Sequence, residues 1–377
     1  MKITKRIALF LSIVMLMSLV IACTPQTETK DPAASTQETQ QDSSGENETT
    51  TPAKADDPIR VALVVNQKFG DLGPCDQMLA GLEKARDDFG VEIKALESDG
   101  VAAHEDDVRA MAREGYDLII TTFPNMTQAT VTVADEYPDT SFGCIYQFVN
   151  NAETSVANIY DAQFEGQDAM YILGAMAATL TRTNKVGFIA GAEEPSPNAD
   201  GNAFMSAIKT YNPDCEVQFA YVGSYEDVAK AKEIAVAMAA AGCDIIQTDA
   251  GKCQVGIIEA AKEAGILVCG DTNDYSENYP EGVYGFFGGD FTNCVYLMIK
   301  DYVEGNFQGG TTGIMNLTNE CFFLTPDMFE NFKTLRPDYA EDMDKAIALY
   351  DELYAQVLSG ELKIPFNTDT PNWANYQ

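Results

Sequence analysis

The sequence has a single histidine and little positive charge. Lysine and arginine number 24 against 58 aspartates and glutamates, which gives a formal net charge of -34. A surface of that sign repels nucleic-acid phosphates and anionic lipid, so nucleic acid is excluded as a partner. The one histidine, His104, is predicted at the start of a surface helix, where we expect it to be solvated. A serine or cysteine nucleophile therefore lacks the base that it needs.

The motifs of cofactor enzymes are also missing. The loop after the first predicted strand has only Gly70-Asp71-Leu72-Gly73 in place of the G-x-G-x-x-G of dinucleotide sites. No Walker A loop occurs, and no C-x-x-C pair accompanies His104 to form a zinc site. Acidic residues are so abundant that any two of them look like a catalytic pair. We expect no enzyme activity, no cofactor and no metal.

The N-terminus is typical of a targeting segment. Lys2, Lys5 and Arg6 precede an uncharged run over 7–22, which is short for a membrane span and typical of a signal peptide. The run ends Val20-Ile21-Ala22-Cys23 and resembles a bacterial lipobox, in which Cys23 becomes the lipidated first residue. The alternative is an ordinary signal peptide with a chance cysteine. Residues 24–57 have no aromatic or branched aliphatic side chain, which predicts a flexible tether over 23–57. The lipid would hold the protein on the extracytoplasmic face of the cell membrane.

The remaining cysteines are scattered, and most lie beside predicted strands, where they are expected to pack as small apolar residues. One or two disulfides stay open outside the cytoplasm. These cysteines are Cys75, Cys144, Cys215, Cys243, Cys253, Cys269, Cys294 and Cys321.

Two stretches share one plan of helix, glycine and apolar strand. Gly115 precedes Tyr-Asp-Leu-Ile-Ile, and Gly242 precedes Cys-Asp-Ile-Ile-Gln. In the second stretch Val228, Ala231 and Ile234 recur at threes and fours, which indicates one buried helical face. Such joints occur in many α/β proteins. Combined with the chain length, the repeat predicts two similar α/β lobes with a ligand between them.

Strands alternate with helices along the folded region, which predicts parallel sheets with right-handed crossovers. The expected strands span 59–65, 91–96, 118–122, 141–146, 155–160, 185–190, 216–221, 245–246, 266–269, 283–287 and 313–317. The expected helices span 76–89, 104–114, 127–137, 164–181, 198–211, a stretch beginning near 228, 255–264, 292–304 and 341–359.

Ligands of open α/β sheets bind outside the carboxyl ends of the strands. In this chain those ends are rich in carboxylates, amides and aromatic residues and hold no basic cluster. This composition suits a neutral hydroxylated ligand with a flat apolar part. The candidate ligand-binding residues are Asn66, Phe69, Asp71, Phe123, Asn125, Tyr146, Asp249, Asp271 and Phe286.

Several long stretches carry a family resemblance. They include VALVVNQKFGDLGPCDQMLAGLEKA from Val61, FEGQDAMYILGAMAATLTRTNKVGFIAG from Phe164 and IIEAAKEAGILVCGDTND from Ile257. With the lipobox and tether, they resemble the basic membrane protein family of ABC-transporter substrate-binding lipoproteins, known for binding purine nucleosides. The resemblance covers nearly all of the predicted folded region.

The resemblance implies a type I periplasmic-binding fold, two Rossmann-like lobes joined by a three-strand hinge that closes on the ligand. The first lobe would span 58–162 plus 288–310, and the second 163–287 plus 311–365. It also implies that Asp271 holds the ribose hydroxyls. The family's Asp-Lys-Ser-Phe-Asn loop falls on 71–75, where only Asp71 is kept, and a family lysine falls on Gly289. Phe69, Phe123, Tyr146, Phe286 and Phe287 are candidates for a replacement aromatic face, or else core aromatics.

Three functions remain in view at this point. The first is a receptor that delivers a nucleoside-like ligand to an ABC permease. The second is a ligand-sensing receptor of the same fold without a transport role. An enzyme is the third, and the missing catalytic groups oppose it. A helix or turn cap is the alternative role for either aspartate, Asp71 or Asp271.

Overall fold

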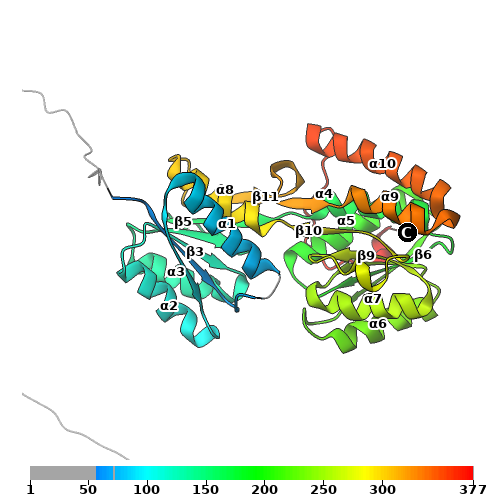
Figure 1. Cartoon of the computed structure of the whole chain (residues 1–377), viewed down its shortest axis with the longest axis horizontal. Helices are drawn as coiled ribbons and strands as arrows, with labels where there is room; N and C mark the ends of the chain where they lie inside the picture. Colours follow the sequence, from blue (N-terminus) through cyan, green and yellow to red (C-terminus); the bar gives the residue numbers. More distant parts are fainter. Residues whose placement is uncertain (1–56, 71–72, 377) are drawn as a thin grey trace, which may run out of the picture. The chain divides into compact units, whose positions relative to one another are not determined.

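A computed structural model describes residues 57–70 and 73–376 (Figure 1). The predicted signal segment, Cys23, the tether up to residue 56 and Asp71 lie outside the described residues. These described residues form one compact unit. That unit contains two six-stranded sheets, each surrounded by its own helices.

The first sheet has the strand order β11-β5-β4-β3-β1-β2, and all its neighbours pair in parallel. Its centre is nearly continuous apolar sequence, as expected for a parallel sheet covered on both faces. In β1, for example, every residue from Val61 to Val65 is buried. The strands are β1 (Arg60–Val65), β2 (Glu92–Glu97), β3 (Leu118–Thr122), β4 (Ser141–Ile145), β5 (Ile159–Phe164) and β11 (Thr311–Met315).

The second sheet has the order β12-β10-β9-β8-β6-β7. Its strands are parallel except β12, which runs antiparallel to β10 at the sheet edge. The strands are β6 (Lys185–Ala190), β7 (Glu216–Tyr221), β8 (Ile245–Asp249), β9 (Leu267–Asp271), β10 (Val283–Gly289) and β12 (Phe322–Leu324).

Ten α-helices occur among the described residues. In Figure 1, α1, α2, α3 and α8 accompany the first sheet, and α4, α5, α6, α7, α9 and α10 accompany the second. They are α1 (Pro74–Phe89), α2 (Val101–Arg113), α3 (Thr127–Glu136), α4 (Gln167–Leu180), α5 (Pro195–Tyr211), α6 (Val228–Ala240), α7 (Gln254–Ala264), α8 (Phe291–Val303), α9 (Pro326–Leu335) and α10 (Ala340–Ser359).

The chain passes between the two sheets three times: from β5 to α4, from β10 to α8, and from β11 to β12. Each passage carries a phenylalanine. The rings of Phe164 and Phe291 stack with centroids 4.9 Å apart, and Phe322 lies edge-on to Phe164 at 5.6 Å. The hinge is therefore a packed aromatic contact between segments that are distant in sequence.

One predicted lobe boundary differs from the structure. The sequence placed 311–315 in the second lobe, but Thr311–Met315 pairs with Tyr160–Phe164 at the edge of the first sheet. The predicted strand at 155–160 is likewise later in the chain, at Ile159–Phe164. Both strands are short and only partly apolar, so their periodicity alone did not fix their sheet or their ends.

The prediction that His104 is solvated is wrong. Helix α2 begins at Val101, three residues before His104, so this side chain points inward and is only 1% exposed. Its Nδ1 lies 2.8 Å from the Ser98 hydroxyl, which in turn donates to Asp107. Burial lowers the pKa of His104, which favours the neutral ring.

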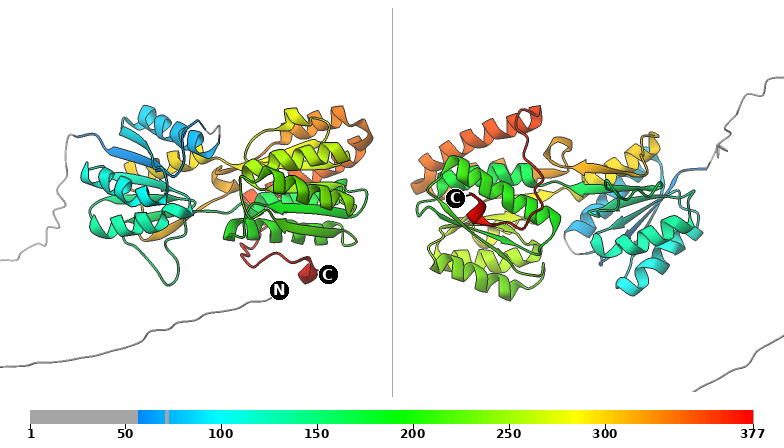
Figure 2. Two further views of the ribbon diagram at one scale, coloured as in Figure 1. Left: turned by 90° about the horizontal axis from the view of Figure 1, so that it is seen from below. Right: turned by 180° about the vertical axis from the view of Figure 1, so that it is seen from behind.

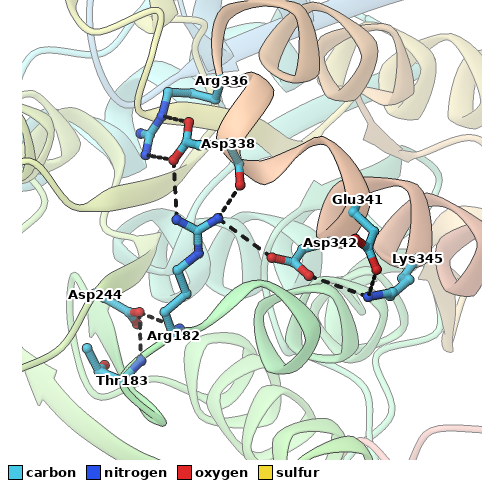
Figure 3. A network of polar contacts seen from close by, with 8 residues as sticks. All are labelled: Arg182, Thr183, Asp244, Arg336, Asp338, Glu341, Asp342 and Lys345. Atoms are coloured by element: carbon cyan, nitrogen blue, oxygen red, sulfur yellow. Dashed lines mark hydrogen bonds and ion pairs between the residues drawn. The ribbon is translucent and has the colours of Figure 1, made fainter.

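A network of ion pairs and hydrogen bonds links several segments of the second lobe near the amino end of its sheet (Figure 3). The Asp244 carboxylate accepts hydrogen bonds from the backbone N–H groups of Arg182 and Thr183 at 2.6 and 3.0 Å. The Arg182 guanidinium pairs with Asp338 at 3.2 Å. Arg336 donates to both Asp338 oxygens and lowers the pKa of that carboxyl to about 2. The network joins the loop after α4 to the start of α10.

The end of the chain forms a strap, residues 365–376, that runs back along α5 (Figure 2). The Asn202 amide donates to the carbonyls of Asn367 and Asp369 at 3.0 and 2.7 Å. The Tyr376 hydroxyl donates to the Asn202 carbonyl, and Trp373 stacks on Tyr376. The strap thus contacts α5, the helix that follows β6.

No helix within residues 57–70 and 73–376 is long and apolar enough to cross a bilayer. Seven cysteines of this part, beginning with Cys144, are buried free thiols, as expected for small apolar residues. They are Cys144, Cys215, Cys243, Cys253, Cys269, Cys294 and Cys321.

Candidate functional site

The carboxyl ends of the first sheet bring four predicted residues together in two pairs. The Asn66 amide donates to the Asn125 side chain at 2.7 Å, which joins the ends of β1 and β3. The rings of Phe123 and Tyr146 lie 6.0 Å apart at the ends of β3 and β4. Amides beside an aromatic face suit a planar ligand with polar edges.

Two other predicted aromatic residues, Phe69 and Phe286, make different contacts. Phe69 is half-buried, and its backbone N–H donates to Glu97 at 2.9 Å. Phe286 lies within β10, where it is buried and packs edge-on against Phe323. Phe286 therefore has the surroundings of a core aromatic, which is one of the two roles that the sequence left open.

Three residues at strand ends adopt a strained backbone. Phe123, Tyr146 and Thr272, after β3, β4 and β9, have φ values of 61°, 56° and 55°. This left-handed region disfavours residues with a Cβ and costs roughly 1–3 kcal/mol each. Their N–H groups still bond to the neighbouring strands, at Ile145, Ala162 and Phe287 respectively. Such strain concentrates where a fold positions side chains for a ligand.

Asp271 closes β9 with a carboxylate that is fixed on one side only. Its Oδ2 accepts the backbone N–H groups of Ala250 and Gly251, the latter at 2.9 Å. The Gln254 side chain holds the Asp271 backbone in addition. Oδ1 has no partner, although the residue is only 1% exposed. Burial raises the pKa of Asp271 to about 6, against the opposing effect of the Gly251 and Ala250 N–H groups and of the nearby Thr248 hydroxyl.

Asp249 ends the neighbouring strand β8 and is half-buried. Its Oδ2 is also unpartnered. Burial, with the charges of Asp271 and Glu194, raises the pKa of Asp249 to about 8. The two predicted aspartates of the second sheet therefore lie close enough to interact.

Tyr225 is a site residue that was not among the predicted ones. Its ring covers the ends of β6 and β8, because a Cβ built on Gly191 would lie 2.2 Å from the ring. Its hydroxyl lies 3.1 Å from a carboxylate oxygen of Glu194, to which it donates. Tyr225 follows β7 within Val222-Gly-Ser-Tyr, so the end of this strand was the signal that could have found it.

Asp200 was also missed as a site residue. It lies in α5, is 4% exposed, and its Oδ1 has no partner. Burial and the charges of Asp249 and Asp168 raise its pKa well above the ordinary value. Tyr146 of the first lobe lies near the same group, since burial and the charges of Asp249 and Glu194 raise the pKa of Tyr146.

Comparisons with known proteins bear on the family and the fold of the chain. A family model described as "ABC transporter substrate-binding protein PnrA-like" matches residues 59–359. Basic membrane protein A of Borreliella burgdorferi is 24% identical over 316 residues, covering 82% of this chain and 89% of that protein. The ABC transporter nucleoside-binding protein BmpA of Lactococcus lactis subsp. cremoris is 26% identical over 250 residues, covering 61% and 69%.

Among solved structures, an ABC-transporter solute-binding protein from Aeropyrum pernix superposes with a TM-score of 0.66 at 23% identity. The match covers 84% of this chain and 96% of that one. The predicted fold class, a periplasmic-binding architecture of two α/β lobes, is confirmed.

Proposed function

Because this chain belongs to the PnrA-like family of ABC transporter substrate-binding proteins, we propose that it captures a purine nucleoside or a similar small polar ligand and delivers it to an ABC permease. The ligand lies between the carboxyl ends of the two sheets. The lobes close over it by rotation at the three crossings. The protein is a receptor and carries out no reaction.

One observation carries this proposal: the unpartnered Oδ1 of buried Asp271. A buried carboxylate oxygen without a donor is costly, and a hydroxyl from a ligand removes that cost. The backbone N–H groups hold the other oxygen, so the free one keeps its direction. A sugar diol offers two donors to such a carboxylate.

The aromatic side chains support the flat part of the ligand. Tyr225 on the second lobe and the Phe123–Tyr146 pair on the first supply faces for a base. The Asn66–Asn125 pair supplies amide donors and acceptors at its edge. The nucleoside-binding relative from Lactococcus lactis favours this ligand class over a sugar alone.

We also propose that the protein works on the extracytoplasmic face, held by lipid on Cys23. A sensing receptor without a transport role uses the same fold, and a neighbouring permease gene distinguishes the two.

The direct test is mass spectrometry of the ligand released from purified protein, followed by calorimetry with purine and pyrimidine nucleosides and free sugars. We expect a purine nucleoside to bind and to compete with the released molecule. Binding of a sugar alone, with no nucleoside binding, overturns the ligand class.

A further inference from the structure

We infer that Ser196 and Asp200 of α5 are positioning residues, which form the pivot about which the second lobe turns on the first. The inference rests on the proposed function, since it names the contacts that guide the lobes onto a ligand of that same site.

The two residues contact the first passage of the chain between the sheets, residues 164–167. The Ser196 hydroxyl donates to the Phe164 carbonyl at 2.8 Å. The Asp200 carboxylate lies against Gly166, because a Cβ built on that glycine would be 3.0 and 3.1 Å from its two oxygens. Since Ser196 and Asp200 are four apart on one helix, they project from the same face. That face of α5 therefore holds the passage at two points.

The two points belong to different lobes. Phe164 ends β5 of the first sheet, whereas Gly166 is the N-cap of α4 in the second lobe. Helix α5 itself accompanies the second sheet. The contact of Asp200 with Gly166 thus stays within the second lobe, and the bond from Ser196 to Phe164 reaches across to the first.

All three passages meet at this bond. The rings of Phe291 and Phe322, from the second and third passages, pack on the ring of Phe164. The axis of any rotation between the lobes therefore runs close to the Ser196 hydroxyl. Atoms near an axis move least, so a hydrogen bond at this place persists while the lobes open and close. Ser196 and Phe164 are 5% and 1% exposed, so water does not compete for the bond.

The first passage also has space beside it. Glu165, Gln167 and Asp168 line a cavity of about 220 Å³ together with Thr318 of the third passage. The rest of its wall is the end of α10 and the stretch 360–364, and none of the described residues that line it belongs to α5. The passage is thus held by α5 and has room to bend away from that helix.

The first test is Ser196→Ala, which removes the bond to Phe164 and leaves the ligand contacts in place. Without the pivot the lobes should adopt a wider range of angles, so closing on a ligand costs more conformational entropy. We expect calorimetry to show an affinity about 2- to 10-fold lower, as for the loss of one hydrogen bond. The factor should be the same for adenosine, guanosine and inosine, because their own contacts are unchanged. Small-angle X-ray scattering should give a larger radius of gyration for the ligand-free variant than for the ligand-free wild type.

Ser206→Ala is the matched control. Ser206 is half-buried on the same helix, about 15 Å further along its axis. This variant should bind and scatter as the wild type does, and melting temperatures verify that each variant is folded.

The second test enlarges Gly166. The methyl group of Gly166→Ala would lie 3.0 and 3.1 Å from the Asp200 oxygens and 3.0 Å from the Phe322 ring, so α5 must move away from the passage. We expect a greater loss of affinity than in Ser196→Ala. Asp200→Ala makes room for the methyl group, so the double variant should lose less affinity than the two single losses combined. Additive losses would contradict the contact on which the pivot depends.

The pivot inference and the proposed function fail in different ways. If nucleosides bind to the wild type and to Ser196→Ala equally well, with equal radii, the pivot inference is wrong and the proposed function stands. A loss that differs between nucleosides would mean that Ser196 contacts the ligand, which also overturns the pivot. If no nucleoside binds to the wild type, the proposed function is wrong. The ligand-free radii still decide the pivot inference in that case, and equal radii overturn it.

Discussion

The two carboxylate oxygens of Asp271 differ: Oδ2 accepts backbone hydrogen bonds, whereas Oδ1 has no partner. A substitution that changes only one of these properties can therefore test the role of the residue. Asp271→Asn keeps an acceptor for the N–H groups of Ala250 and Gly251 but turns an amide toward the ligand hydroxyls. A hydrogen bond to a charged group contributes roughly 1.5–3 kcal/mol. We expect nucleoside affinity to fall about 10- to 100-fold, measured by calorimetry.

The control for that variant is Asp214→Asn, which should bind as the wild type does, because Asp214 is exposed and precedes β7. If Asp271→Asn lowers the melting temperature but leaves affinity intact, Asp271 is a structural cap of the 250–251 turn. That result would support the alternative that the sequence left open.

Asp249 should make stability depend on pH. Its pKa of about 8 in the folded protein exceeds the ordinary value of about 3.9 for an unfolded chain. Between those values the folded state holds a proton that the unfolded state has lost, so stability decreases as pH rises from about 4 to 8. Asp249→Asn should flatten this decrease and melt at a higher temperature than wild type at pH 8. Thermal unfolding of the ligand-free wild-type and Asp249→Asn proteins at pH 5 and 8 measures this decrease. If the melting temperatures of the two proteins change equally between these pH values, the burial of this carboxyl is contradicted.

Position along a strand explains which site residues could be predicted. Asp249 and Asp271 end apolar strands, and Asn66, Phe123, Asn125 and Tyr146 follow such strands, so the rule for open sheets selects them directly. Asp200 escaped because it lies inside α5, a helix that was also expected over 198–211, and does not directly follow a strand. There it faces Gly166, where an added Cβ would lie 3.0 Å from its Oδ2. Such an approach depends on tertiary packing and leaves no local pattern.

Local sequence pattern also decides which strands and helices could be predicted. The helices and strands around Gly115 and Gly242 were predicted because their apolar periodicity is strong and a glycine at positive φ ends each helix. Strand β12 has only three residues, too few to show alternation, and α9 lies in a stretch that the sequence left unassigned. Both are held by contacts with β10. The family, and with it a binding protein rather than an enzyme, was predicted correctly.

The C-terminal strap should stabilise α5. Asn202→Ala leaves the carbonyls of Asn367 and Asp369 without this donor and removes the side-chain oxygen that accepts from the Tyr376 hydroxyl. We expect a loss of about 1–3 kcal/mol and a melting temperature lower by several degrees. Trp373 is the only tryptophan, so its fluorescence should also shift toward that of a solvated indole.

Asn306→Ala is the comparison for that variant, since Asn306 is exposed and its side chain bonds only weakly to Glu304, at 3.4 Å. It should leave the melting temperature and the emission unchanged. An Asn202→Ala protein with wild-type emission would mean that the remaining contacts, such as those of Thr368 with Asn198 and of Thr370 with Glu193, hold the strap without the Asn202 side chain.

Ligand binding should make the whole molecule more compact. Among the described residues three segments join the two sheets, so we expect the lobes to rotate as bodies about the Phe164, Phe291 and Phe322 contact. Small-angle X-ray scattering should show a smaller radius of gyration once the released ligand is added at saturation. The same titration on Asp271→Asn should need a higher concentration. An unchanged radius at proven saturation would exclude closure.

Attachment to the membrane is predicted from the sequence alone. Cys23→Ala should abolish lipidation and move the protein from the membrane fraction to the soluble fraction. Metabolic labelling with a fatty acid measures the first effect and fractionation the second. Label retained by the Cys23→Ala protein would contradict the lipobox assignment.

The repeated crossing of the chain between the two sheets also affects folding during translation. The first sheet begins at Arg60 but acquires its edge strand only at Thr311–Met315, and the second acquires its own at Phe322–Leu324. A chain emerging from the ribosome can therefore complete neither sheet until most of its length has been translated. Contacts this distant in sequence form slowly, and partly folded chains expose apolar strand edges in the meantime. The edge of β5 that receives β11 and the edge of β10 that receives β12 therefore stay unpaired until most of the chain has been translated.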